Sequence, residues 1–160
     1  MKQLIYALQF RGEALPVAQS PNVVNVKATT SSSQITTNVG AQGVRTIHQA
    51  PGPAANGQAT VEAQVRLTGE NAFHETGTVT FGAGGHRVRF STLGQGYIGP
   101  SADPALRHGS VIWKVDGGEG QFEGASGLIT ANFTVGNAGE LTVNQFGVIF
   151  APSEAGTMER

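Results

Sequence analysis

Hydrophobic and polar residues alternate along much of this chain with the two-residue period of β-strands. In Ala59–Thr68, alanine, valine and leucine alternate with threonine, glutamate, glutamine and arginine. This pattern gives one apolar and one polar face, as in an antiparallel strand between core and solvent. Lys2–Arg11 has the same period, with an apolar face formed by Leu4, Tyr6, Leu8 and Phe10. No segment shows the 3.6-residue period of an amphipathic helix.

A β-hairpin is predicted from Thr76 to Leu93. The strands Thr76–Phe81 and His86–Leu93 flank Gly-Ala-Gly-Gly, a composition typical of hairpin turns. If the four-residue loop pairs Phe81 with His86, two further pairs follow, which are Val79 with Val88 and Gly77 with Phe90. The opposite face then carries Thr78, Thr80, Arg87 and Arg89.

The C-terminal third contains three more predicted strands, at 109–116, at 121–135 with a break near Gly124–Gly127, and at 140–150. Gly136–Gly139 joins the last two, and we expect it to pair Val135 with Glu140. One face of this hairpin would then hold Ile129, Ala131, Phe133, Phe146 and Val148. The other would hold Leu128, Thr130, Asn132, Leu141, Val143, Gln145 and Ile149.

Neither predicted face of this last hairpin is polar, so something should cover the outer one. We expect a homo-oligomer, a dimer built through that face. The alternative is that the segment 17–57 covers it within one chain. That segment is a polar ribbon or a loop. Asn22–Thr29 and Gln34–Val39 could form a ribbon across Ser31–Ser33, with a short strand at Arg45–His48 and a loop at 51–57.

Length and composition fit a single domain over residues 1–160. Successive strands with short turns, about seven clear ones and one or two less clear, predict an all-β fold, an antiparallel up-and-down barrel. The net charge of −1 excludes the clustered basic surface that nucleic acid binding requires. Cysteine is absent, and no apolar run is long enough for a membrane helix. We therefore expect a cytoplasmic protein with neither nucleic acid nor membrane as a partner.

Trp113 and the run GGEGQFEGASG at Gly117–Gly127 resemble a pattern in small barrels related to allene oxide cyclase and dirigent proteins. There, a G-x-G-x-F-x-G-A-x-G run links two strands of an eight-stranded calycin-like barrel. The resemblance covers about the last third of the chain, and a bacterial member is expected. Members of this group guide cyclisation or coupling of reactive organic intermediates without a cofactor. The resemblance therefore implies no cofactor, and it transfers no ligand-steering residue to this chain.

The titratable residues give no local site. His48, His74, His86 and His108 lack the short spacing of metal ligands, so no metal site is predicted. Among carboxylates within or beside the predicted strands, Glu62 and Glu123 are expected on the outer face and Asp116 in a turn. Gly94–Gly99 matches a dinucleotide-binding motif, but a strand follows it where that motif needs a helix.

Two functional hypotheses follow. The first is binding of a small apolar organic molecule in a barrel cavity, with cofactor-free cyclase or isomerase activity as an extension. The second is a non-enzymatic, self-associating barrel with a filled interior. The sequence does not decide whether the protein is an enzyme. Candidate ligand-binding residues, chosen for rigid apolar surface or hydrogen-bonding capacity, are Arg89, Tyr97, Trp113, Asn132 and Gln145.

Overall fold

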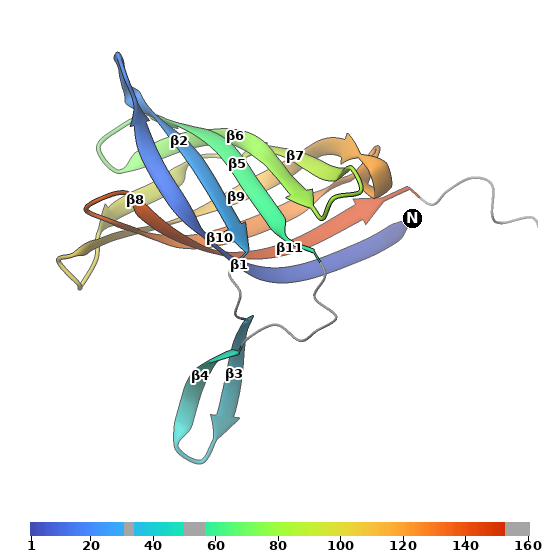
Figure 1. Cartoon of the computed structure of the whole chain (residues 1–160), viewed down its shortest axis with the longest axis horizontal. Helices are drawn as coiled ribbons and strands as arrows, with labels where there is room; N and C mark the ends of the chain where they lie inside the picture. The colour runs from blue at the N-terminus through green and yellow to red at the C-terminus, as the bar shows by residue number, and fades with distance from the viewer. Residues whose placement is uncertain (31–33, 50–56, 153–160) are drawn as a thin grey trace, which may run out of the picture.

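The computed structural model describes residues 1–30, 34–49 and 57–152. Its main body is a closed antiparallel barrel of eight strands, which confirms the predicted all-β fold (Figure 1). The barrel strands are β1 (Lys2–Val17), β2 (Ser20–Thr30), β5 (Ala59–Leu67), β6 (Ala72–Phe81), β7 (His86–Thr92), β9 (Leu106–Glu119), β10 (Ser126–Gly136) and β11 (Glu140–Ala151). They follow one another in that order around the ring. Pairing of β9 with β10 and of β11 with β1 closes it.

Two further strands form no part of this ring. β3 (Gln34–Gly40) and β4 (Gly43–Gln49) pair only with each other and form a separate two-stranded sheet. The predicted ribbon between Asn22–Thr29 and Gln34–Val39 is therefore wrong, because β2 pairs with β1 and β5 instead. The predicted loop at 51–57 lies outside the described residues except for Gly57. Figure 1 shows the β3–β4 sheet projecting from one side of the barrel.

Inward side chains alternate with outward ones along every barrel strand. The fully buried positions are apolar, and the largest of them are Phe10, Ile129, Ile149, Val61, Val79 and Val88. The β6–β7 hairpin has the predicted register, with Phe81 opposite His86 and Gly77 opposite Phe90. A Cβ atom at Gly77 would overlap the backbone of the neighbouring strand β5. Glycine is therefore required there by close strand approach.

The predicted register of the last hairpin is wrong by one residue. Val135 pairs with Leu141, not with Glu140. The connection is shorter than expected, because Gly139 takes a positive φ of 88° and its N–H donates to the carbonyl of Gly136. A left-handed residue closing a three-residue loop is a common hairpin geometry. Since a one-residue slip moves every side chain to the other face, Leu141, Val143, Gln145 and Ile149 point into the barrel.

Two boundaries also differ from the sequence prediction. A short strand, β8 (Gly96–Pro100), lies inside the stretch predicted as a connection, and it pairs with β9 and with the start of β6. The strand β6 begins at Ala72, four residues before the predicted start at Thr76. The part of the chain that the structure describes contains no helix long and apolar enough to span a membrane.

Candidate functional site in the barrel

One end of the barrel is filled by aromatic side chains. Tyr6 and Phe81 contact edge to face at 5.1 Å, and Phe81 lies 5.2 Å from Phe122. Phe122 belongs to η1 (Gly120–Phe122), a single 3-10 turn between β9 and β10, and it is buried. This end therefore offers no space for a ligand between the three rings.

Toward the opposite end the barrel is hollow. A cavity of about 170 Å³ lies there, lined mainly by valine, leucine, alanine and phenylalanine side chains. Its walls come from β8 and from every barrel strand except β7, and Phe73 and Phe133 are in edge-to-face contact at 5.8 Å. An engineered apolar cavity of roughly 150 Å³ is enough to bind benzene. The volume thus suits a small organic molecule.

Glu75 is a carboxylate in the wall of this cavity. Its side chain points inward from β6 and is 6% exposed. Burial raises the pKa of Glu75 from 4.5 to about 7, although a hydrogen bond from Trp113 opposes the rise. Burial in apolar surroundings disfavours the charged form of a carboxyl group, which is the physical cause of this shift. Near neutral pH, Glu75 therefore populates both its protonated and its ionised form.

Two neighbours hold Glu75 in place. The indole Nε1–H of Trp113 donates to Oε1 of Glu75 at 3.0 Å. The ring of Trp113 is itself fixed by stacking on Phe90, with centroids 3.9 Å apart. On the backbone, the Thr92 hydroxyl accepts from the N–H of Glu75 at 2.8 Å and donates to its carbonyl at 3.1 Å. Within the described residues no hydrogen bond engages Oε2, so that oxygen is available to a ligand.

Arg107 provides a positive charge at the rim of the cavity. Arg107 lies near the start of β9, where it pairs with Val135 of β10. Its side chain is exposed to solvent and lines the opening of the cavity. A ligand that enters from this end would pass an exposed guanidinium before reaching the apolar wall. The cavity thus has a cationic mouth and a titratable carboxyl group further inside.

A second polar pair lies inside the barrel but outside the cavity lining. The hydroxyl of Tyr6 donates to Oε1 of Gln145 at 2.8 Å. Burial raises the pKa of Tyr6 well above its ordinary value, so this phenol stays protonated. The amide Nε2 of Gln145 is buried and has no partner among the described residues. This pair helps to fix the barrel interior and does not line the cavity.

The sequence candidates separate into inner and outer residues. Trp113 lines the cavity, and Gln145 is buried in the interior. Arg89 points outward and lies 3.8 Å from the exposed Glu119. Tyr97, 47% exposed, and Asn132 are also on the outer surface. These last three cannot contact a molecule in the cavity.

The sequence prediction missed Glu75. Glu62 and Glu123 are exposed, as expected. The prediction of a turn at Asp116 is wrong, because β9 continues through it to Glu119; Asp116 is exposed and lies 3.7 Å from Lys114. The strand predicted from the sequence begins at Thr76, which leaves Glu75 outside it. Val79 and Gly77 lie on the same face of the strand. Continuing this two-residue alternation to Glu75 would have placed the Glu75 side chain inside the barrel.

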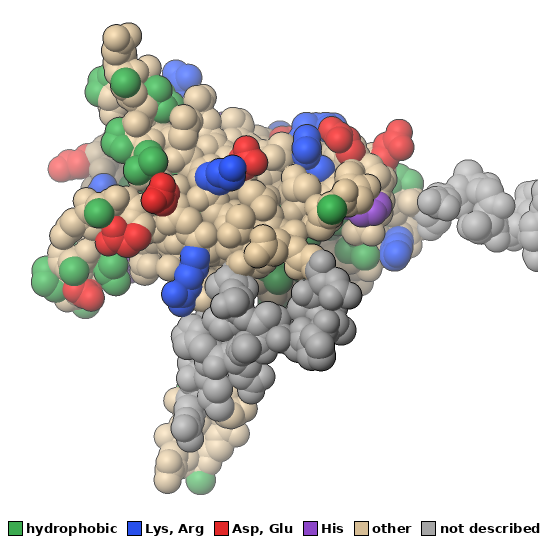
Figure 2. Space-filling view, viewed as in Figure 1, with side chains coloured by type: hydrophobic (Ala, Val, Ile, Leu, Met, Phe, Trp, Pro, Cys, Tyr) green, Lys and Arg blue, Asp and Glu red, His purple; other side chains and the backbone are tan. Residues whose placement is uncertain are grey.

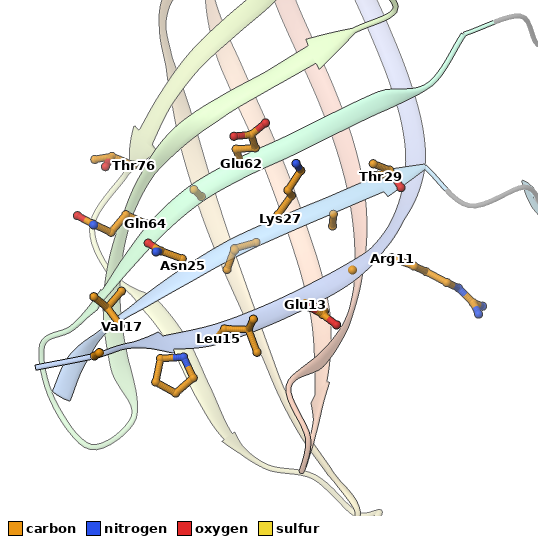
Figure 3. A pocket seen from close by; sticks show the side chains of 16 residues that line it. Arg11, Glu13, Leu15, Val17, Asn25, Lys27, Thr29, Glu62, Gln64 and Thr76 are labelled. Carbon is orange, nitrogen blue, oxygen red and sulfur yellow. The ribbon is translucent and has the colours of Figure 1, made fainter. Parts of the chain in front are cut away.

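A second depression lies on the outer face of β1, β2 and β5 (Figure 3). Figure 3 shows Arg11, Glu13, Lys27 and Glu62 around it, pointing away from the barrel interior. It is a broad groove, open to solvent, with charges of both signs. The internal cavity is the better candidate, because it lies inside the barrel and contains a carboxyl group with a shifted pKa.

No group of three or more histidine, aspartate or glutamate side chains in the described ranges is arranged to hold a metal ion. Neither a family model nor a curated protein matches the chain. Among solved structures, the pterocarpan synthase dirigent protein GePTS1 is similar, with a TM-score of 0.47 and 13% sequence identity. The match covers 96% of this chain and 89% of that one. At this level it supports no statement about ligand or reaction, and the relation to allene oxide cyclase and the bacterial source stay predictions.

Proposed function

We propose that this protein binds a small, mainly apolar organic molecule in the barrel cavity and moves a proton on it through Glu75. The reaction class is a cofactor-free isomerisation or cyclisation. The observation that carries the proposal is the buried Glu75 carboxyl group in the wall of an apolar cavity of about 170 Å³.

The arrangement suits general acid–base chemistry. A group with a pKa of about 7 can both accept and donate a proton near neutral pH. Trp113 holds Oε1, so Oε2 would face the reacting atom. In the proposed reaction, Oε2 takes a proton from one carbon of the ligand and returns a proton to another atom. The ligand is then rearranged with no net oxidation, and the carboxyl group returns to its starting state.

Binding can be measured independently of turnover. The chain has one tryptophan, Trp113, whose fluorescence should change when a ligand enters the cavity. Small cyclic ketones and substituted benzenes are suitable probes, and ligand binding should also raise the melting temperature. Ala131→Leu should abolish both signals, because Ala131 is buried and lines the cavity. Ala83→Leu, in the exposed turn between β6 and β7, should bind like the parent. If Ala131→Leu folds and still binds, the cavity is not the site.

Proton transfer can be tested with 3-cyclohexenone, whose isomerisation to the conjugated ketone is followed by ultraviolet absorbance. Glu75→Gln should lower the rate by roughly 10²-fold or more, the usual contribution of a general base. It should still bind the ketone, because the amide keeps nearly the same shape. Glu62→Gln, at an exposed position of β5, is the matched control. Equal rates in parent and Glu75→Gln would contradict the proposed role of Glu75.

One observation favours the alternative function, a non-enzymatic self-associating barrel. An outer face of the barrel, described below, is nearly free of charge. The other element of this alternative, a filled interior, applies to the aromatic end of the barrel but not to the hollow end.

A further inference from the structure

The outer face of β9, β10, β11 and β1 is apolar at its centre. Strand register aligns Ile112, Thr130, Phe146 and Ala7 in one row across the four strands. The adjacent row consists of Lys114, Leu128, Val148 and Ile5. We define the β1/β9–β11 face as the outward residues of these two rows together with those of one further row on each side. The flanking rows contain Gln3, Phe150 and Ser126 on one side, and Gln9, Asn144, Asn132 and Ser110 on the other.

Exposed hydrophobic side chains are concentrated on this face. Of the eleven large hydrophobic residues that are exposed in the described part of the chain, five lie here. Their exposed fractions run from 38% to 59%, and they are Ile5, Ile112, Leu128, Phe146 and Phe150. Single exposed hydrophobic residues are ordinary, but a contiguous group on adjacent strands marks an interaction surface.

The β1/β9–β11 face is also nearly free of charge. Among its outward residues, Lys114 is the single charged one, and it lies at the rim, 3.7 Å from Asp116. Other parts of the barrel carry more charge. Figure 2 shows basic and acidic side chains interleaved over the side that faces the viewer. Depletion of charged residues at the centre, with aromatic anchors, is typical of protein interfaces.

The size of the face fits a small protein–protein interface. Four strands at a spacing of about 4.8 Å give a width of about 19 Å, and the four rows extend about 20 Å along the strands. The flat area is roughly 400 Å², and protruding side chains increase the accessible area well beyond it. Weak specific interfaces bury up to about 600 Å² on each partner. The face is therefore large enough for a weak dimer and small for a permanent one.

We propose that this face binds a second copy of the same chain. The barrel is closed, so copies that associate through the barrel wall cannot add strand to strand there and must pack face to face. The net charge of −1 gives little repulsion between copies, and the one charge of the face, Lys114, lies at the rim beside Asp116, so the face is poorly suited to a charged partner. Phe146 lies between the small residues Ala7 and Thr130. A two-fold axis near Phe146 would place each phenyl ring on the small residues of the other copy.

This conclusion reaches the predicted dimer by a different route. The sequence argument assigned Leu141, Val143, Gln145 and Ile149 to the same face as Leu128, but they point into the barrel. The exposed apolar residues instead include Phe146 together with residues of β9 and β1. The prediction considered only the last hairpin and therefore did not include those two strands. The described part of the segment 17–57 does not cover this face, since the five residues above stay exposed and β2 belongs to the barrel wall.

Light scattering from low to high micromolar concentration tests the proposal. The parent should approach about 33 kDa, twice the chain mass of 16.5 kDa. Leu128→Lys should stay near 16.5 kDa at the same concentrations, whereas Leu15→Lys should dimerise like the parent. The two leucines are matched, at 47% and 48% exposed, but Leu15 lies outside the β1/β9–β11 face. A parent that stays monomeric, or a folded Leu128→Lys variant that dimerises normally, would overturn the proposal.

Thiol labelling gives a second readout that requires no destabilising change. The chain has no cysteine, so a single introduced thiol is unambiguous. The thiol of Thr130→Cys should react with a maleimide more slowly as protein concentration rises, because the second copy covers it. Thr76→Cys, exposed on another part of the barrel, should react at a constant rate. Equal behaviour of the two thiols would overturn the assignment, as would a monomer that binds phosphatidylcholine vesicles through this face.

Discussion

At the scale of single residues, Glu75 is the least favourable group for stability and the most useful one for chemistry. Its carboxyl group is buried among apolar side chains, with one hydrogen bond from Trp113. A barrel that needed only a packed interior would be more stable with an uncharged residue there. The retention of a titratable group at the cavity wall is the pattern expected of a functional site.

The first prediction concerns the pH dependence of stability. Folding raises the pKa of Glu75 from 4.5 to about 7, so the folded protein holds a proton that the unfolded chain releases between these values. The Glu75 contribution to stability is therefore fully present below about pH 4.5 and is lost as pH rises toward 7. Glu75→Gln should remove this loss and stabilise the protein by roughly 3 kcal/mol at about pH 8, with little effect at about pH 4.

Urea unfolding of parent, Glu75→Gln and Glu62→Gln at several pH values measures this difference. Glu62 is exposed on the same sheet, so its variant should follow the parent at every pH. A difference between Glu75→Gln and parent that does not change with pH would show that Glu75 titrates normally.

The second prediction concerns Trp113. This side chain is 2% exposed, stacks on Phe90 and donates to Glu75. Trp113→Ala should cost about 3–5 kcal/mol, the usual range for removing a large buried aromatic side chain. Trp113→Phe should cost less but should also raise the pKa of Glu75, because the donor that favours its ionised form is lost. A loss below about 0.5 kcal/mol on Trp113→Ala, typical of surface positions, would contradict its place in the core.

At the scale of elements, the glycine run between β9 and β10 determines how the chain passes from one strand to the next. Gly120 and Gly124 take positive φ angles of 63° and 71° around η1, and Gly127 takes 146° at the start of β10. This turn places Phe122 against Phe81 at the filled end of the barrel. The backbone conformation of the run is therefore linked directly to core packing.

The third prediction is that alanine substitutions in this run destabilise the protein for backbone reasons. Gly127→Ala should be the most costly, because a Cβ there would overlap the backbone of β11 in addition to requiring a positive φ. Gly124→Ala should lower stability by about 1 kcal/mol or more. Gly40→Ala is the control, since a Cβ at that position meets nothing within 4 Å and its φ is not positive. Thermal unfolding measures all three, and unchanged melting temperatures for both run variants would contradict this account.

At the scale of the whole molecule, the barrel closes without any contribution from β3 and β4. The strands β2 and β5 pair directly from Val23 with Arg66 to Thr29 with Thr60. The hydroxyl of Thr30 accepts from the backbone N–H of Ala59 at 3.3 Å, so the two strand ends lie next to each other. The separate β3–β4 sheet is therefore an insertion between two adjacent barrel strands.

The fourth prediction follows from this insertion. Replacing residues 31–58 with Asn-Gly, which favours a two-residue hairpin turn, should leave the barrel folded. We expect its free energy of unfolding to change by no more than about 1–2 kcal/mol, since all eight barrel strands and the core are kept. Circular dichroism and urea unfolding test this expectation. Loss of cooperative unfolding would show that the insertion is needed for barrel stability.

The sequence by itself determined most of the barrel strands, several of their faces and one hairpin register. The two-residue period of Ala59–Thr68 and Lys2–Arg11 is a local property, and so is the turn of Gly-Ala-Gly-Gly. For this reason the inward row of Leu4, Tyr6, Leu8 and Phe10 and the register of β6 with β7 agree with the structure.

Only the tertiary structure decided which residues line the cavity and which outer face is apolar. Periodicity assigns residues to faces, but it does not say where a strand begins or how a glycine turn shifts the register. Pairing with β5 and β8 extends β6 back to Ala72 and brings Glu75 inside. The positive φ of Gly139 shifts β11 by one residue and reverses its faces. Alternation encodes neither effect, because the first depends on which strands pair with β6 and the second on the backbone conformation of a glycine turn, whose Gly139 carbonyl also accepts a hydrogen bond from Ala14 of β1.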